Sequence, residues 1–292
     1  MTDGLPNVQN GTFRLVDAAW NEFVYGGHFL ALGDALTLWA LGLVAGIPVT
    51  WDFLVIVYLC VFAANLYNRK TEAEHDTLGN GVRVKVMAKY DRAFVPITVV
   101  SLGIVIFLLL RFANIAVLLF AAVVFGISIL YTAVLKPLTK YVVGFKSYVA
   151  AFFYALMVPL MATYYGQRIG WAVLLVFVFY FVRIFISNAA CDIKDTESDG
   201  KRGLKTLAVY FGNEKAARIL RIVSLLSAIP IVVGIYLGAL PLFAAAILLT
   251  VVYAYYYLMP NHAADNETLT ALIIDGEFLF WLPLVLIGRA FL

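Results

Sequence analysis

Charged residues are scarce in this sequence. Lysine, arginine, aspartate and glutamate make up 13% of its 292 residues, whereas hydrophobic residues make up 63%. A soluble domain carries about one-quarter charged residues. This composition therefore excludes an ordinary water-soluble protein and makes the lipid bilayer the expected solvent for much of the surface. The net charge of +3 is small, and no nucleic-acid partner is expected.

Cysteines and long polar segments are equally rare. The two cysteines, Cys60 and Cys191, lie in different apolar segments and have no metal-site spacing, so we expect two buried thiols without a chemical role. We find no soluble domain, cleavable signal peptide or low-complexity linker. We therefore expect residues 1–292 to form one integral membrane domain. Its first 25 residues would be a short arm outside the membrane or an interfacial helix.

Apolar segments of about 20 residues recur along the whole chain, which is the length that crosses a bilayer as a helix. We predict an all-α, polytopic membrane protein with nine transmembrane helices around a central cavity. The expected spans are residues 27–49, 51–67, 93–110, 112–135, 147–166, 169–188, 219–238, 240–259 and 269–291. The uncharged run 222–264 is too long for one crossing, and Gly238 to Pro241 is a natural place for it to turn.

Basic residues are distributed unevenly between the two sides of these spans. With Arg14, the loops after the second, fourth and sixth spans hold 17 of the 21 lysines and arginines. Arg111, Arg168 and Arg289 lie on the other side. Because positive charge favours the cytoplasmic side, we expect the N-terminus, the three long loops and the active site to be cytoplasmic. These loops would form a cap over that site.

The second span ends in a polar stripe formed by Asn68, Glu72 and Asp76. A spacing of four places these residues within an arc of about 80° on one helix face, over a rise of about 12 Å. The stripe would present three oxygen-bearing side chains at the cytoplasmic end of its helix.

The sixth span ends in a similar stripe. Asn188, Asp192, Asp195 and Asp199 fall within an arc of about 60° if the helix continues through them. Carboxylates gathered on one face repel one another unless a cation neutralises them, and magnesium binds such oxygens together with phosphate oxygens. Two facing stripes would hold two Mg²⁺ ions around one diphosphate, and nearby lysines and arginines would bind its remaining charge.

The two stripes occupy matching positions, because Asn68 and Asn188 are 120 residues apart and each follows an even-numbered span. This spacing favours an internal duplication, with motifs near 68–76 and 188–199 and the site at the interface of the two halves. Acidic loops that are simply solvated are the plainer explanation of either stripe alone, but they do not explain the match.

These motifs resemble those of the UbiA-type intramembrane prenyltransferases. The family pattern N-x-x-x-D-x-x-x-D is similar to Asn68-x-x-x-Glu72-x-x-x-Asp76, with Glu72 in place of an aspartate. Its second pattern, D-x-x-D-x-x-x-D, matches the run from Asp192 to Asp199, including the basic, glycine-containing tail. The loop element Tyr131-x-x-x-x-Lys136 is also similar to the family's.

The resemblance implies a site and a reaction. Its metal ligands would be Asn68, Glu72, Asp76, Asp192, Asp195 and Asp199. Its diphosphate-binding residues would be Arg69, Arg83, Lys136, Lys140, Lys194 and Lys201. Catalysis would involve Asp192, Asp195, Asp199, Lys136 and Tyr131. The implied reaction ionises the allylic carbon–oxygen bond of a polyprenyl diphosphate, after which an electron-rich acceptor captures the cation away from water.

Three functions fit the sequence. The first is Mg²⁺-dependent prenyl transfer to a hydrophobic, aromatic acceptor of the quinone-precursor type. The second is transfer to a lipid-like alcohol such as a prenylated glycerol phosphate. The third is a cation-coupled transporter, although transporters place their acidic groups nearer the midplane of the membrane.

Four charged residues lie within or at the edge of the expected spans: Asp34, Arg183, Asp275 and Glu277. Such residues are costly in a bilayer and often functional. Asp34 is the best placed to line the cavity, whereas Asp275 and Glu277 fit equally well at the cytoplasmic boundary.

Overall fold

The expected all-α architecture is confirmed for the described part of the chain. The computed structural model describes residues 8–71, 81–90, 92–130, 136–259 and 271–292, and these ranges contain helices and connecting turns but no strand. The elements of the first half are α1 (Val8–Tyr25), α2 (His28–Ala45), α3 (Trp51–Thr71), α5 (Gly81–Tyr90), α6 (Phe94–Phe112), α7 (Ile115–Leu130) and η2 (Lys136–Lys140). Those of the second half are α8 (Phe145–Ala155), α9 (Met157–Tyr164), α10 (Trp171–Lys194), α11 (Thr196–Lys201), α12 (Leu207–Phe211), α13 (Asn213–Leu226), α14 (Ile229–Tyr236), η3 (Leu242–Leu248), α15 (Leu249–Tyr257), η5 (Ala271–Asp275) and α17 (Glu277–Phe291).

The described part of each of the nine expected spans coincides with a helix or with two consecutive helices. Five of these are both long and apolar enough to cross a bilayer, namely His28–Ala45, Phe94–Phe112, Phe145–Tyr164, Trp171–Lys194 and Asn213–Tyr236. Three shorter apolar helices lie at Trp51–Tyr67, Ile115–Val124 and Leu242–Tyr257. The length and apolar composition of these helices identify the chain as an integral membrane protein. The count of nine crossings stays a prediction.

Glycines end two of the helices at turns that require a positive φ. Gly46 has φ 72° and follows α2, where the Ile47 N–H donates to Gly42 O at 2.8 Å. Gly238 has φ 66°, and the Ala239 N–H donates to Gly234 O at 2.8 Å. Both are the backward hydrogen bond of a Schellman cap. The second cap confirms the turn expected between Gly238 and Pro241.

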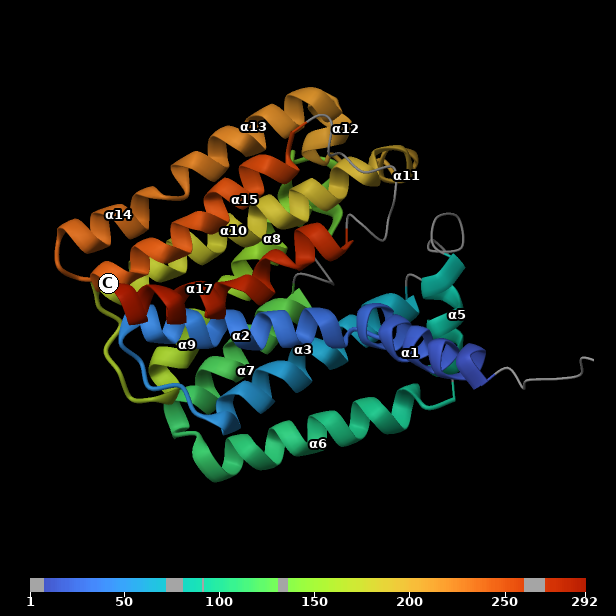
Figure 1. Ribbon diagram of the computed structural model, residues 1–292, viewed down its shortest axis with the longest axis horizontal. Helices are drawn as coiled ribbons and strands as arrows, with labels where there is room; N and C mark the ends of the chain where they lie inside the picture. Colours follow the sequence, from blue (N-terminus) through green and yellow to red (C-terminus); the bar gives the residue numbers. More distant parts are fainter. Residues whose placement is uncertain (1–7, 72–80, 91, 131–135, 260–270) are drawn as a thin grey trace, which may run out of the picture.

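Prolines divide two of the spans into pairs of helices. Pro159 lies three residues into α9 and Pro230 two residues into α14. Because proline has no N–H to donate, a carbonyl of the preceding turn loses its helical partner at each of these positions. Each pair nevertheless forms one candidate span, Phe145–Tyr164 and Asn213–Tyr236, and Figure 1 shows α13 running on into α14.

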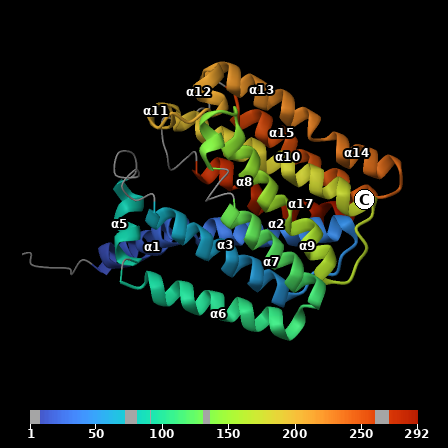
Figure 2. The same ribbon diagram turned by 180° about the vertical axis from the view of Figure 1, so that it is seen from behind.

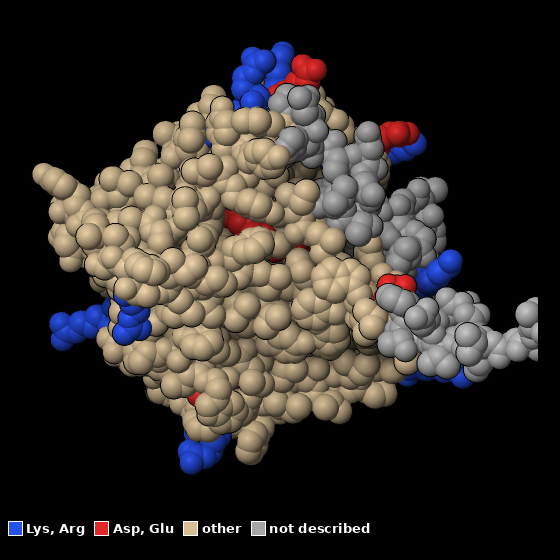
Figure 3. Space-filling model, in the orientation of Figure 1, with Lys and Arg blue, Asp and Glu red and all other residues tan. Residues whose placement is uncertain are grey.

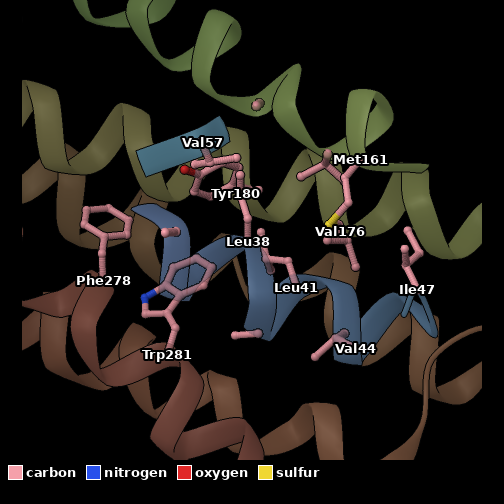
Figure 4. Packing of buried hydrophobic residues seen from close by; sticks show 14 of the residues in the cluster. Leu38, Leu41, Val44, Ile47, Val57, Met161, Val176, Tyr180, Phe278 and Trp281 are labelled. Atoms are coloured by element: carbon pink, nitrogen blue, oxygen red, sulfur yellow. The ribbon is translucent and has the colours of Figure 1, made fainter. Parts of the chain in front are cut away.

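The core is built around α2. Leu38 and Leu41 of this helix are almost fully buried, and they pack with Tyr180 of α10 and Trp281 of α17 (Figure 4). Small residues allow close approach between the helices. A Cβ at Gly288 of α17, for example, would lie only 2.6 Å from the Ala246 side chain of η3. Close backbone packing of this kind is what holds helices together in lipid.

The outer surface is apolar. In α6 only Ser101, Val105 and Leu108 are buried, and Figures 1 and 2 both show this helix on the outside of the bundle, next to α3. Figure 3 shows basic and acidic residues mainly around the margins of a broad face that is otherwise neither basic nor acidic. This distribution suits a molecule with lipid around its middle and water at both ends.

One end of the bundle carries the short helices. Figure 1 places α5, α11 and α12 there, beyond the end of α10. The loop after α11 is joined to the segment around η2, because the Lys205 N–H donates to Thr139 O at 2.9 Å and the Gly144 N–H to Lys205 O at 2.7 Å. The cap and the internal duplication both stay predictions, since residues 72–80 and 131–135 lie outside the described ranges.

Candidate active site at the end of α10

The second acidic motif lies where α10 passes into α11. Helix α10 ends at Lys194, and Asp195 forms the junction with φ −90° and ψ 12°. The Asp199 N–H donates to Asp195 O at 2.8 Å. The spacing predicted one uninterrupted helix face for this stripe. The structure instead interrupts the helix at Asp195. Asp192 and Asp199 nevertheless remain on the same side, because both are buried and both contact Lys146.

Two residues of α8 hold these carboxylates. Lys146 Nζ lies 3.0 Å from Asp192 Oδ1 and 3.5 Å from Asp199 Oδ2. Ser147 Oγ donates to Asp192 Oδ2 at 2.5 Å. Helix α8 packs along α10, so its first turn brings an amine and a hydroxyl to the acidic stripe. Both carboxylate oxygens of Asp192 are thus occupied.

The stripe is short of positive charge even with this lysine. Burial raises the pKa of the Asp199 carboxyl above its usual range, and the neighbouring Asp192 and Asp195 act in the same direction. The Lys146 charge opposes this shift, as does Arg202, whose Nη1 lies 4.0 Å from Asp199 Oδ1. Partly buried carboxylates that repel one another are the setting in which a further cation is stabilising.

The expected diphosphate-binding lysines are placed unequally. Lys140 and Lys194 are exposed at the same end of the molecule as the motif. Lys201 is exposed too, but its Nζ bonds the Glu197 carboxylate at 2.6 Å. This exposed pair, one helical turn apart, is worth little energy, so it leaves Lys201 able to turn towards a phosphate.

The first motif is only partly described. Asn68 and Arg69 lie in the last turn of α3, Arg83 lies in α5 and Lys136 begins η2, but their side chains are outside the described part. Glu72, Asp76 and Tyr131 lie in undescribed segments altogether. The roles expected for these residues stay predictions.

The described residues contain no group of three His, Cys, Asp or Glu side chains placed to hold a metal. Their chemistry nevertheless fits a hard cation at this end. Asp199 Oδ2 is buried and accepts no hydrogen bond, so it is an oxygen available to a cation. The buried amide nitrogens of Asn65 and Asn188 have no partner among the described residues, and as donors they suit an acceptor such as a phosphate oxygen. Unsatisfied buried polar groups are uncommon. Here they flank the ends of the two helices that carry the motifs.

Arg183 and Glu277 form a buried ion pair within the bundle. The guanidinium bonds Glu277 Oε1 through Nε at 3.0 Å and through Nη2 at 2.5 Å. It also donates to Ser224 Oγ and to Thr250 O, each at 3.0 Å. The pair joins α10, α13, α17 and the start of α15, on the side of α10 away from Asp192. It is a packing element, so Glu277 does not lie at a solvated boundary.

Asp34 lies deeper in the bundle, as the sequence predicts. Its side chain is buried, and the Tyr180 hydroxyl donates to Asp34 Oδ1 at 3.3 Å. Asp275 of η5 is close enough for its charge to act on Asp34. Tyr180 is twelve residues before Asp192 on α10, which corresponds to about 18 Å along the helix. Asp34 is therefore remote from the acidic motif.

The described helices form a bundle of apolar rods with acidic and basic side chains gathered at one end. The chain belongs to the UbiA prenyltransferase family, whose model matches residues 30–282. It is an enzyme, a prenyltransferase, and the transporter interpretation is set aside.

The chain is also similar to one named relative and to one solved structure. The chain is 29% identical over 195 residues to a digeranylgeranylglyceryl phosphate synthase from Pyrococcus abyssi (strain GE5 / Orsay), covering 64% of this chain and 67% of the relative. It also resembles a solved structure described as giving structural and mechanistic insights into the biosynthesis of digeranylgeranylglyceryl phosphate synthase in membranes. The two structures superpose with a TM-score of 0.55 at 14% sequence identity, and the match covers 92% of this chain and 95% of the other. The second likeness supports the fold alone.

The sequence motifs did not indicate Lys146, Ser147 or Asn65. Lys146 counted only as one positive charge of a cytoplasmic loop. The signal that could have found it is its position at the very start of an apolar helix, next to a serine. An amine at the end of the molecule that carries the acidic motif has few partners at the membrane boundary other than the carboxylates of that motif.

Proposed function

We propose that this protein transfers a prenyl chain from a polyprenyl diphosphate to the hydroxyl of a lipid-like alcohol, of the prenylated glycerol phosphate class. The observation that carries the proposal is the similarity to the archaeal synthase, which spans about two-thirds of both chains. This similarity favours the lipid alcohol over the aromatic quinone precursor that the sequence motifs alone made the first expectation.

The distribution of charge supports such an acceptor. A prenylated glycerol phosphate has a polar head with a negative phosphate and a long apolar chain. The site end of the molecule offers exposed bases for the head, including Lys140, Lys194 and Arg202, and apolar helices for the chain. We propose that this end faces the cytoplasm, in line with the excess of basic residues there.

The reaction breaks the bond between C1 of the prenyl chain and the diphosphate oxygen and forms an ether bond between C1 and the acceptor oxygen. The alcohol proton leaves with the diphosphate or passes to water. We propose that Asp192, Asp195 and Asp199 hold Mg²⁺ together with Asn68, Glu72 and Asp76. When bound, the ions would supply positive charge to the departing diphosphate. The basic side chains would bind its outer oxygens.

The buried helices have two further tasks. They exclude water, which would otherwise capture the allylic cation and give a free prenyl alcohol. They also hold the donor chain and the acceptor chain side by side, so that the acceptor oxygen meets C1 without a search through the bilayer.

The test is product analysis with purified protein in lipid nanodiscs. Geranylgeranyl diphosphate is supplied with geranylgeranylglyceryl phosphate or with an aromatic carboxylic acid, in Mg²⁺ or in EDTA, and products are identified by mass spectrometry. We expect the ether-linked product only with the lipid alcohol and Mg²⁺, and none from an Asp192→Asn control. A product formed only with the aromatic acid would restore the quinone-precursor interpretation, and equal turnover in EDTA would refute the metal role.

A further inference from the structure

The amine of Lys146 occupies the second acidic stripe. It lies within 3.5 Å of oxygens of both Asp192 and Asp199, and these two side chains are only 4% and 2% exposed. We propose that Lys146 is an internal cation that neutralises this stripe and must leave it before a divalent cation binds. The inference rests on the proposed function, because it takes the stripe to be a metal site.

The argument starts from the oxygens themselves. Ser147 takes Asp192 Oδ2, so Asp192 Oδ1 is the oxygen left for a cation, and it is the atom that Lys146 contacts. Asp199 Oδ2 accepts no hydrogen bond and has the same amine as its near neighbour. A divalent ion that binds these two oxygens would lie against the Lys146 ammonium. Like charges at such a distance in a partly buried site repel strongly, so the two cations compete.

The Lys146 side chain is flexible enough to move. Lys146 lies two residues after the turn at Gly144, its stem has four flexible carbons, and its side chain is 42% exposed. Once displaced, the amine remains at the same end of α8, within reach of a diphosphate that arrives with the metal. The expected consequence is that metal alone binds weakly, whereas metal together with diphosphate binds well, because the diphosphate offers Lys146 new oxygens.

The experiment measures metal binding directly. Mn²⁺ serves as the paramagnetic probe, and electron paramagnetic resonance reports free and bound ion for the full chain in detergent micelles without diphosphate. We expect Lys146→Met to bind Mn²⁺ about tenfold more tightly than the wild type, since a competing charge has been removed. The matched control is Lys215→Met, an exposed lysine of α13, which should leave the affinity unchanged. Unchanged or weaker binding by Lys146→Met would overturn the proposal.

A measurement on the wild-type protein covers the case in which that variant does not fold. Acetylation of lysines by a water-soluble ester, followed by mass spectrometry, reports how free each amine is. Saturating Mn²⁺ should increase the labelling of Lys146 several-fold relative to Lys215, and equal labelling would refute displacement. The two proposals fail separately. Metal-dependent prenyl transfer with unchanged Mn²⁺ affinity removes only the role of Lys146. A shift in Mn²⁺ affinity without any prenyl transfer removes only the function.

Discussion

Replacing Glu277 with glutamine keeps the shape of the side chain but removes the negative charge that faces the Arg183 guanidinium. Arg183 is fully buried and has no water to replace that charge. Breaking a buried ion pair by neutralising one partner costs about 3–5 kcal/mol. For a chain of this size that corresponds to a fall in the melting temperature of about 5–8 °C.

The neighbouring contacts allow the size of this effect to be checked internally. Ser224→Ala removes one neutral hydrogen bond to the guanidinium, so it should cost only about 1 kcal/mol. The double variant Arg183→Met/Glu277→Leu removes both charges, and it should recover most of the stability that Glu277→Gln loses, because apolar pairs of similar volume replace buried ion pairs well.

The assay is thermal unfolding in a mild detergent, followed by size-exclusion chromatography of the protein that stays monodisperse. All three variants and the wild type are heated in parallel. If Glu277→Gln melts within about 2 °C of the wild type, the charge is not buried against Arg183. If the double variant melts at or below the temperature of Glu277→Gln, removing both charges recovers nothing and the two residues do not act as a pair.

Three further predictions concern the site and the packing. Asp192→Ala and Asp199→Ala should each reduce prenyl transfer at least about 100-fold and leave the elution profile of the folded protein unchanged. Turnover near that of the wild type in either variant would show that the metal site lies elsewhere. Glu72→Asp should keep part of the activity because it keeps the charge, whereas Glu72→Gln should lose more; the reverse order of rates in the same assay would exclude Glu72 as a metal ligand. Gly288→Ala should destabilise the protein by about 1–3 kcal/mol, because its new methyl group would lie 2.6 Å from Ala246 Cβ and 2.8 Å from Phe243 O, and an unchanged melting temperature would contradict this packing.

The helical rods were predictable from the sequence because each depends on one local property, a run of apolar residues long enough to cross lipid. Gly238 could be assigned to a turn for a similar reason, since the uncharged run around it exceeds one crossing. The breaks within the rods were less accessible. Pro159 and Pro230 lie inside apolar runs, and the structure shows that α9 begins two residues before Pro159 and α14 one residue before Pro230.

Contacts between distant residues could not be read from the sequence. Arg183 and Glu277 are 94 residues apart, and no spacing rule joins them. Lys146 meets Asp192 because α8 and α10 run side by side, which depends on the tertiary arrangement. The sequence therefore identified the second acidic motif and its chemistry, but not the amine that neutralises it.

The length of helix α10 can be compared with the thickness of the bilayer. Trp171, at the end away from the acidic motif, is 71% exposed, and tryptophans at helix ends typically sit at headgroup depth. Asp192 is 21 residues further on, which is about 32 Å along the axis. The hydrocarbon layer of a typical membrane is about 30 Å thick. With the helix axis along the membrane normal, this length brings the carboxylate to the water boundary. We therefore expect the acyl-chain length of the host lipids to tune the rate of prenyl transfer.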